Sequence, residues 1–416
     1  MIRPIADRKN KDHFGFYLVD DFKTYSKLEA IEYAIKTNKQ VKWSLNQQAY
    51  DQFDWTVEPP ESLEYWYKTR AEQLRDKYDY IVLFYSGGAD SYNVLDSFVK
   101  NNIFIDEITQ FHFLDGTGGD KYHSANGEVF FTAAPETQSL IQNNPVYANT
   151  KNRLIDMTSY MLTPLGLPQN KRDWFYMGNN YPNPLGYCMS RLRDIEPDYR
   201  RLADQGKRVC FLWGVDKPRL SYKNKQFYIR LVDTCLSVFV NAKSQVQNDK
   251  SEFDEAFYWT PDLPELIAKQ AHVMKNFIEK MIALKEKKFF SFQDIEDETL
   301  TDDKVLSAIE NAGNDENKYS LPIDIIHRLI YPTWNPEGRI LCPKPPSPFF
   351  GGRSEWVFRS NAPRIGQDWY GQGVVWMRDF LLKNYPQIWW EKPFDKNLGH
   401  GRGGMHSLSV SYPMTR

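Results

Sequence analysis

The sequence has 416 residues, of which 41% are hydrophobic and 25% charged, a balance typical of a globular protein and unlike a disordered or collagen-like chain. Its formal net charge of −2 excludes a general electrostatic attraction to nucleic acid or to an anionic membrane. The four cysteines lie far apart without a CxxC pair, so neither a disulfide scaffold nor a structural zinc site is expected. There is no apolar run of about 18 residues and no apolar signal segment, so we expect a cytoplasmic protein with no membrane partner.

Residues 1–78 are predicted to form an N-terminal, α-rich region. Apolar residues follow a helical spacing from Leu28 onward, behind Ser26 and Glu29, which form a plausible capping box. A second helical pattern covers residues 61–77, directly after a Pro-Pro turn.

Residues 79–250 are predicted to form an α/β domain, because short apolar runs alternate with helical patterns. We expect strands at residues 80–86, 107–114, 209–214 and 226–233, and helices at residues 94–99, 152–161 and 187–206. The first strand, YIVLFYS, is continuously apolar, which is typical of a strand buried on both faces of a parallel sheet. The pattern therefore predicts a doubly wound parallel sheet.

Two further regions follow. Residues 251–330 are predicted to be helical, with start signals at Thr260 and Pro261 and apolar residues at helical spacing from Leu266 to Met281. Residues 331–416 are rich in Gly and Pro and contain six of the 12 tryptophans. We expect this C-terminal region to pack on the α/β domain, either as the wall of a substrate pocket or as a structural covering.

Residues 86–91, SGGADS, connect the first predicted strand to the next helix and are called the 86–91 loop below. A turn that leaves a parallel strand and opens a helix offers unpaired backbone amides and a positive helix end to an anion. Gly87 and Gly88 let the backbone approach a phosphate closely, and the two serines add hydroxyl donors. Asp90 would repel a phosphate, so its presence implies a bridging Mg²⁺. The alternative is a glycine turn whose polar residues only cap a helix.

The stretch at residues 80–91, YIVLFYSGGADS, resembles the signature of the PP-loop superfamily of N-type ATP pyrophosphatases. The resemblance implies an adenine nucleotide α-hydrolase (HUP) fold and cleavage of ATP between the α- and β-phosphates. It further implies that an acceptor oxygen of a carboxylate, amide or nucleobase is adenylylated, and that a nitrogen or sulfur nucleophile then releases AMP. The expected cofactors are ATP and Mg²⁺, and the expected class is a ligase, synthetase or tRNA-modifying enzyme.

The resemblance also implies site residues. Those near ATP would be Ser86, Gly87, Gly88, Asp90 and Ser91 around the phosphates, Phe111, His112 and Phe113 beside the adenine and ribose, and Gly214. Asp90 and Asp216 would hold the metal, and Lys217 and Arg219 would act with Asp90 in catalysis by neutralising the leaving pyrophosphate. The alternatives are a solvated turn after Gly214 and, for His112, a histidine satisfied within the core.

Several alternatives stay open. The chain lacks the N-terminal cysteine of a built-in glutaminase, so ammonia or sulfur would come from a separate donor. A phosphoadenylyl-sulfate reductase-like enzyme is one alternative, although Cys342 is not in the expected acidic-Cys-Gly context. A non-catalytic nucleotide-binding or viral assembly protein is another, because the aromatic-rich texture also resembles uncharacterised proteins of large tailed bacteriophages. Basic residues between 191 and 230 could bind a nucleic acid, but solvated helix faces explain most such runs.

Overall fold

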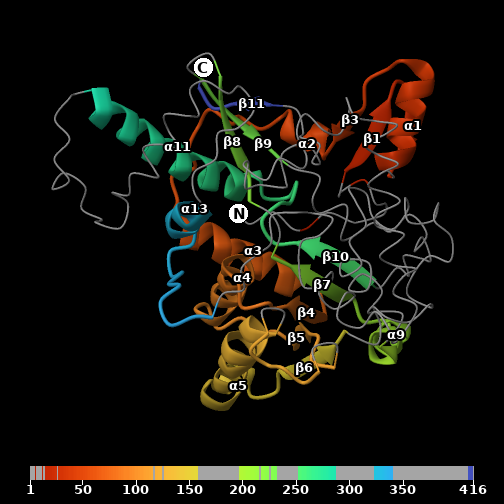
Figure 1. The fold of residues 1–416 in the computed structure, drawn as a ribbon, viewed down its shortest axis with the longest axis vertical. Helices are drawn as coiled ribbons and strands as arrows, with labels where there is room; N and C mark the ends of the chain where they lie inside the picture. Colours follow the sequence, from red (N-terminus) through yellow and green to blue (C-terminus); the bar gives the residue numbers. More distant parts are fainter. Residues whose placement is uncertain are drawn as a thin grey trace.

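A computed structural model describes residues 5, 12, 15–25, 27–115, 118–123, 126–157, 196–214, 217–223, 226–231, 252–286, 323–340 and 411–415. At its centre lies a five-stranded, all-parallel sheet (Figure 1). The strands are β4 (Tyr80–Phe84), β5 (Glu107–His112), β6 (Lys151–Asp156), β7 (Val209–Trp213) and β10 (Glu252–Ala256). Their order is β10-β7-β4-β5-β6.

The strand order puts the first strand of the sheet, β4, in its middle. From β4 the chain winds outward through β5 and β6, and then returns to the other side of β4 to add β7 and β10. This reversal between β4 and β7 is the topological switch point, beside which doubly wound sheets bind their ligands at the carboxyl ends of the strands. The described structure is thus an α/β fold compatible with the predicted doubly wound class.

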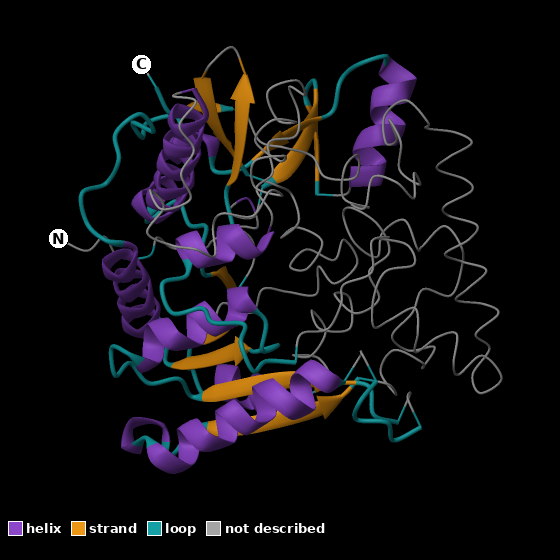
Figure 2. Ribbon diagram, turned by 60° about the vertical axis from the view of Figure 1, so that its left-hand side comes forward, coloured by secondary structure: helices purple, strands orange, loops and turns teal. Residues whose placement is uncertain are grey.

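Helices cover both faces of this sheet, whose strands are orange in the lower half of Figure 2, with helices in purple beside them. On β5, Gln110 donates a hydrogen bond of 2.7 Å to Thr137 on α5 (Ala134–Asn143). Glu107 points to the opposite face, because side chains alternate along a strand, and there it accepts a hydrogen bond from Tyr199 on α9 (Pro197–Asp204). The α5 face also carries α3 (Leu63–Lys77) and α4 (Ala89–Val99), which pack on each other.

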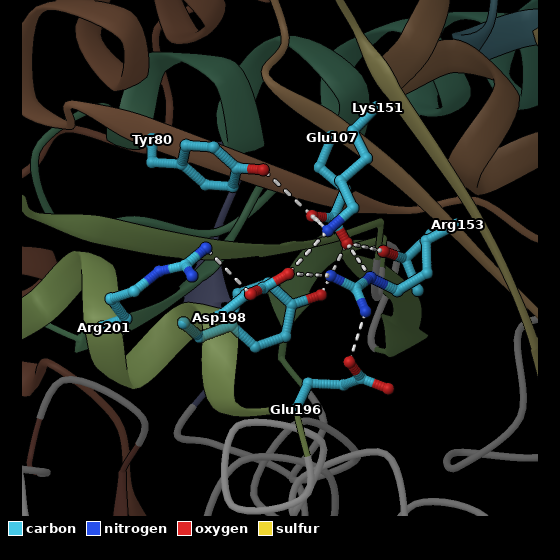
Figure 3. Close-up of polar contacts among 9 residues, drawn as sticks. Tyr80, Glu107, Lys151, Arg153, Glu196, Asp198 and Arg201 are labelled. Atoms are coloured by element: carbon cyan, nitrogen blue, oxygen red, sulfur yellow. Dashed lines mark hydrogen bonds and ion pairs between the residues drawn. The ribbon is translucent and has the colours of Figure 1, made fainter.

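A buried ionic network fastens α9 to the amino-terminal end of the sheet (Figure 3). Glu107 is fully buried, and its carboxylate accepts hydrogen bonds from Arg153 Nε at 2.7 Å and from the Tyr199 hydroxyl at 2.6 Å. The Tyr80 hydroxyl, at 3.0 Å, adds a third donor. The Thr109 hydroxyl on β5 itself also donates, at 2.8 Å. A buried carboxylate needs several partners to offset its lost hydration, and here they come from β4, β5, β6 and α9.

Two smaller antiparallel sheets complete the described structure. The first consists of β1 (Phe16–Val19), β2 (Phe22–Thr24) and β3 (Lys42–Ser44), with α1 (Lys27–Thr37) packed on it, and α2 (Gln47–Tyr50) follows. The second consists of β8 (Arg219–Lys223), β9 (Gln226–Arg230) and β11 (Tyr412–Pro413). The long helix α11 (Pro264–Glu286) packs on this second sheet and also touches α3 and α13 (Ile323–Ile330).

Most of the predicted elements are confirmed. The two N-terminal helices, the helix of residues 94–99, the buried strands at 80–86, 107–114 and 209–214 and the long helix after Pro261 all lie where the sequence placed them. The end of the predicted helical stretch 187–206 forms α9. The strand predicted at 226–233 exists as β9, but it belongs to the antiparallel sheet. The N-terminal sheet was not predicted.

The helix predicted at residues 152–161 is wrong, because residues 151–156 form the edge strand β6. An edge strand is paired on one side only and exposes much of its surface, so Lys151 and Asn152 are exposed and only Ile155 is buried. With so few apolar positions, the sequence period could not separate a strand from a helix. Strand β10 was missed as well, although it pairs with β7 along its whole length. None of the helices in the described part of the chain is long and apolar enough to cross a membrane.

Candidate functional site

The 86–91 loop lies directly after the central strand β4 and opens α4, at the switch point of the sheet. Gly87 has a φ of +81°, which only glycine adopts without strain, and Gly88 is the N-cap of α4. Within the described part of the chain, the backbone amides of Gly87, Ala89 and Asp90 donate to no protein acceptor. These amides at a helix N-terminus form a site with the chemistry to bind an anion.

The two serines have different roles in the loop. Ser91 is buried, and its hydroxyl accepts a hydrogen bond from the Ser86 amide at 3.2 Å and donates to the Gly88 carbonyl at 3.1 Å. These bonds hold the two ends of the loop together. The side chain of Ser86 is 3.1 Å from the Ser91 hydroxyl, but the residue itself is exposed and can reach a ligand.

Asp90 lies in the first turn of α4 and faces residues from two distant segments. Lys217, which follows β7, has its Nζ atom 2.6 Å from Oδ1, and the Tyr331 hydroxyl at the end of α13 donates to the same oxygen. His327 lies behind them, with Nε2 3.9 Å from Oδ1. Partial burial favours the neutral acid, but the charge of Lys217, the electrostatic effect of His327 and the hydrogen bonds from Lys217 and Tyr331 hold the pKa of Asp90 well below its usual range. The carboxylate is therefore ionised.

Gly214 brings the end of β7 against the start of α4. A Cβ atom on Gly214 would lie 3.0 Å from both the Asp90 carbonyl oxygen and the Ser91 Cα, so only glycine permits this approach. The Asp90 carbonyl accepts a hydrogen bond of 2.6 Å from Tyr258, which follows β10. The carboxyl ends of β4, β7 and β10 thus converge on the first turn of α4.

Of the residues predicted beside the adenine, only Phe111 belongs to an aromatic cluster at this edge of the sheet. It stacks on Phe84 with ring centroids 5.4 Å apart, and Trp213 lies 4.1 Å from Phe84 on the other side. Phe113 is fully buried. His112 is buried against Phe130 and accepts a hydrogen bond from the Leu114 amide, and burial lowers the pKa of its imidazole. It therefore has the features of a satisfied core histidine.

Among the charged residues predicted after β7, Lys217 reaches the 86–91 loop, whereas Asp216 lies outside the described residues. Arg219 begins β8, where it is paired in register with Arg230, and no described contact joins it to the loop. Several of the basic residues considered for nucleic-acid binding form ion pairs, such as Arg208 with Asp79 and Arg201 with Asp198. Arg191, Arg193 and Cys342 lie outside the described residues.

Sequence reasoning missed the residues that reach the loop from the C-terminal half. Arg339 donates a hydrogen bond of 3.3 Å to the Gly87 carbonyl, and Tyr331 and Tyr258 hold Asp90. Glu128 is also buried beside the loop, with Oε1 3.4 Å from the place of a Cβ on Gly88. Of these residues, only Tyr331 is an aromatic residue of the aromatic-rich region after residue 330, and that enrichment did not single it out.

The donors fit a Mg²⁺ ion that is held mainly by phosphate. All the described contacts of the Asp90 carboxylate involve Oδ1, so Oδ2 has no protein partner among the described residues. In the described part of the chain, no group of three or more His, Cys, Asp or Glu residues converges on a metal site. Mg²⁺ commonly uses one or two carboxylates together with substrate phosphates and water, and Asp90 can supply one of these.

The chain matches no protein-family model and no curated protein sequence. The functional argument therefore depends on the 86–91 loop and its surroundings.

Proposed function

We propose that this protein is an ATP pyrophosphatase of the PP-loop type, with a nucleotide domain of the adenine nucleotide α-hydrolase kind. In this proposal it adenylylates an acceptor oxygen with Mg·ATP, releasing pyrophosphate, and a nitrogen or sulfur nucleophile then displaces AMP. The observation that carries the proposal is the position of the 86–91 loop, which leaves the central strand β4 at the switch point with three unpaired amides. Nucleotides bind at such positions in doubly wound sheets.

Each part of the loop has a role in this proposal. The amides of Gly87, Ala89 and Asp90 and the Ser86 hydroxyl would bind the β- and γ-phosphates. Lys217 Nζ has three donor hydrogens, so it can keep its contact with Asp90 and also donate to a phosphate oxygen. Asp90 would hold Mg²⁺ through Oδ2, and the ion, when bound, would neutralise charge on the phosphate oxygens.

The chemistry would depend on position and charge. The acceptor oxygen would attack the α-phosphorus, the bond from that phosphorus to the bridging oxygen would break, and the electron pair would leave with pyrophosphate. Lys217 and the loop amides stabilise the negative charge that grows on the departing pyrophosphate, because they are already oriented before the reaction. Asp90 is ionised by its neighbours and needs no change of protonation to bind the metal.

The test uses ATP labelled at the α-phosphate, Mg²⁺ and fractionated extracts of metabolites and RNA. The expected result is labelled AMP and an equal amount of pyrophosphate in the fraction that contains the acceptor. ADP and phosphate as products would refute the proposed bond cleavage. Tight binding of ATP without turnover in any fraction would instead support a non-catalytic nucleotide-binding protein.

A further inference from the structure

The segment of residues 331–340 lies over the 86–91 loop and is fixed there by hydrogen bonds. It continues from α13, and Figure 1 shows it in blue running alongside α4. The Ile340 amide donates to the Thr132 hydroxyl at 3.2 Å, and Thr132 belongs to the π-helix η2 (Val129–Ala133). Ala133, the last residue of η2, lies against Gly87. The segment and the 86–91 loop therefore both contact η2.

Arg339 is a residue of this segment that contacts the loop, and its guanidinium also contacts two aromatic rings and one carboxylate. It lies 4.2 Å from the centre of the Tyr92 ring and 4.9 Å from that of Trp334. Glu136 of α5 accepts from both of its terminal nitrogens. Glu136 in turn accepts a hydrogen bond from Tyr85, the residue just before the loop. A planar guanidinium that is paired with a carboxylate and lies over two aromatic rings is restricted in its orientation.

From this position, Arg339 Nη1 donates to the Gly87 carbonyl oxygen at 3.3 Å. The peptide that joins Gly87 to Gly88 is planar and trans, so its carbonyl and its amide point in opposite directions. Holding the carbonyl toward Arg339 therefore sets the direction of the Gly88 amide, which donates to Ser86 Oγ at 3.4 Å. The orientation of this peptide thus bears on the Ser86 hydroxyl, one of the groups proposed to bind phosphate. Without such a support, two consecutive glycines would let this peptide rotate.

We infer that Arg339 is a positioning residue, which with Glu136 keeps the 86–91 loop in the orientation that binds phosphate. The inference rests on the proposed function, since it assigns this role to the same anion site. In this role Arg339 acts through its hydrogen bond to the Gly87 carbonyl, and its other contacts are with protein groups. We therefore expect its geometry, and not only its positive charge, to affect phosphate binding.

The test measures the affinity of inorganic pyrophosphate and of Mg·ATP by calorimetry for four variants, Arg339→Gln, Arg339→Lys, Glu136→Gln and the double variant Arg339→Gln/Glu136→Gln. We expect each single variant to weaken both affinities about tenfold, equivalent to about 1.4 kcal/mol. The double variant should be no weaker than Arg339→Gln, because both changes break one unit. Arg208→Gln, which breaks an exposed pair with Asp79 at the opposite edge of the sheet, is the matched control.

Opposite results would overturn the inference in recognisable ways. Wild-type affinity in Arg339→Lys would mean that only a positive charge is required. Tighter binding in Glu136→Gln would mean that this carboxylate merely repels phosphate. Unchanged affinity in Arg339→Gln would remove the role altogether. Thermal unfolding establishes the folded fraction of each variant, and if Arg339→Gln does not fold, Arg339→Lys and Glu136→Gln carry the test. If the wild-type protein binds neither ligand, the proposed function fails and the inference fails with it.

Discussion

Lys217 and Asp90 are 127 residues apart in the sequence, yet Nζ of the lysine lies 2.6 Å from Oδ1 of the aspartate. The pair joins the loop after β7 to the first turn of α4, across the switch point of the sheet. It leaves the second carboxylate oxygen of Asp90 without a partner among the described residues. The same side chain can therefore link the two loops and still accept a cation.

Substitution of Asp90 by Asn is expected to abolish Mg²⁺-dependent formation of AMP and pyrophosphate. The amide keeps an oxygen for Lys217 and Tyr331 but loses the charge that attracts the metal, so the fold should persist. We expect a loss of about 100-fold or more, because a metal ion supplies several kcal/mol of charge stabilisation. Product analysis measures it, and Asp96→Asn on the same helix, which bonds Thr333, is the control. Equal losses in both variants would argue against a special role for Asp90.

The two glycines of the loop should respond differently to alanine. Gly87→Ala places a side chain at φ +81° and 3.2 Å from Ala133 Cβ, so it should lower the free energy of unfolding by about 1–3 kcal/mol. Gly88→Ala meets only ordinary contacts of 3.4 and 3.5 Å and, as an N-cap change, should cost less than about 1 kcal/mol. Its methyl group stands beside Ser86 Oγ, where phosphate is expected, so pyrophosphate affinity should fall. Urea denaturation and calorimetry separate the two effects, and strong pyrophosphate binding by Gly88→Ala would place the phosphates elsewhere.

Substitution of Glu107 by Gln should destabilise the protein without changing the anion site. Glu107 is fully buried, and its loss of charge leaves Arg153 without its closest buried partner, for an expected cost of about 3 kcal/mol. Glu196→Gln removes a more exposed partner of the same arginine and should cost less than about 1 kcal/mol. Urea denaturation gives both values. Because the network lies at the amino-terminal edge of the sheet, pyrophosphate affinity should be unchanged, and a large change would mean that the two edges are coupled.

Stability should fall as the pH falls below about 6.5, the ordinary pKa of histidine. Burial lowers the pKa of both His112 and His272 in the folded protein, so below this pH the unfolded chain binds protons that the folded chain does not. Protonation then favours unfolding. His272 Nε2 donates to the Trp55 carbonyl at 3.0 Å, and a glutamine amide can keep this bond. Denaturation midpoints between pH 8 and 5 should therefore change less in His272→Gln than in the wild-type protein. An identical pH dependence would exclude His272 as a source.

The sequence was informative where one local pattern determined the structure. The short apolar runs of β4, β5 and β7 predicted buried strands, and the structure has strands there. Gly214 was expected near the nucleotide only because of the resemblance to PP-loop proteins, and in the structure it lies against the first turn of α4. The edge strand β6 has too few buried positions to show a period. Tyr331 and Arg339 could not be found, because their contacts with the loop span 241 and 252 residues and depend on the whole tertiary fold.

The same long separations determine when the anion site can form during synthesis. A ribosome that adds about 5–20 residues per second makes Arg339 roughly 10–50 s after Gly87. During that interval the nascent chain has the two glycines but nothing to hold the carbonyl between them. Lys217 emerges in the meantime and can neutralise Asp90 before Tyr331 exists. Under the proposed function, the full affinity for a nucleotide would thus be reached late, after the central strands have left the ribosome.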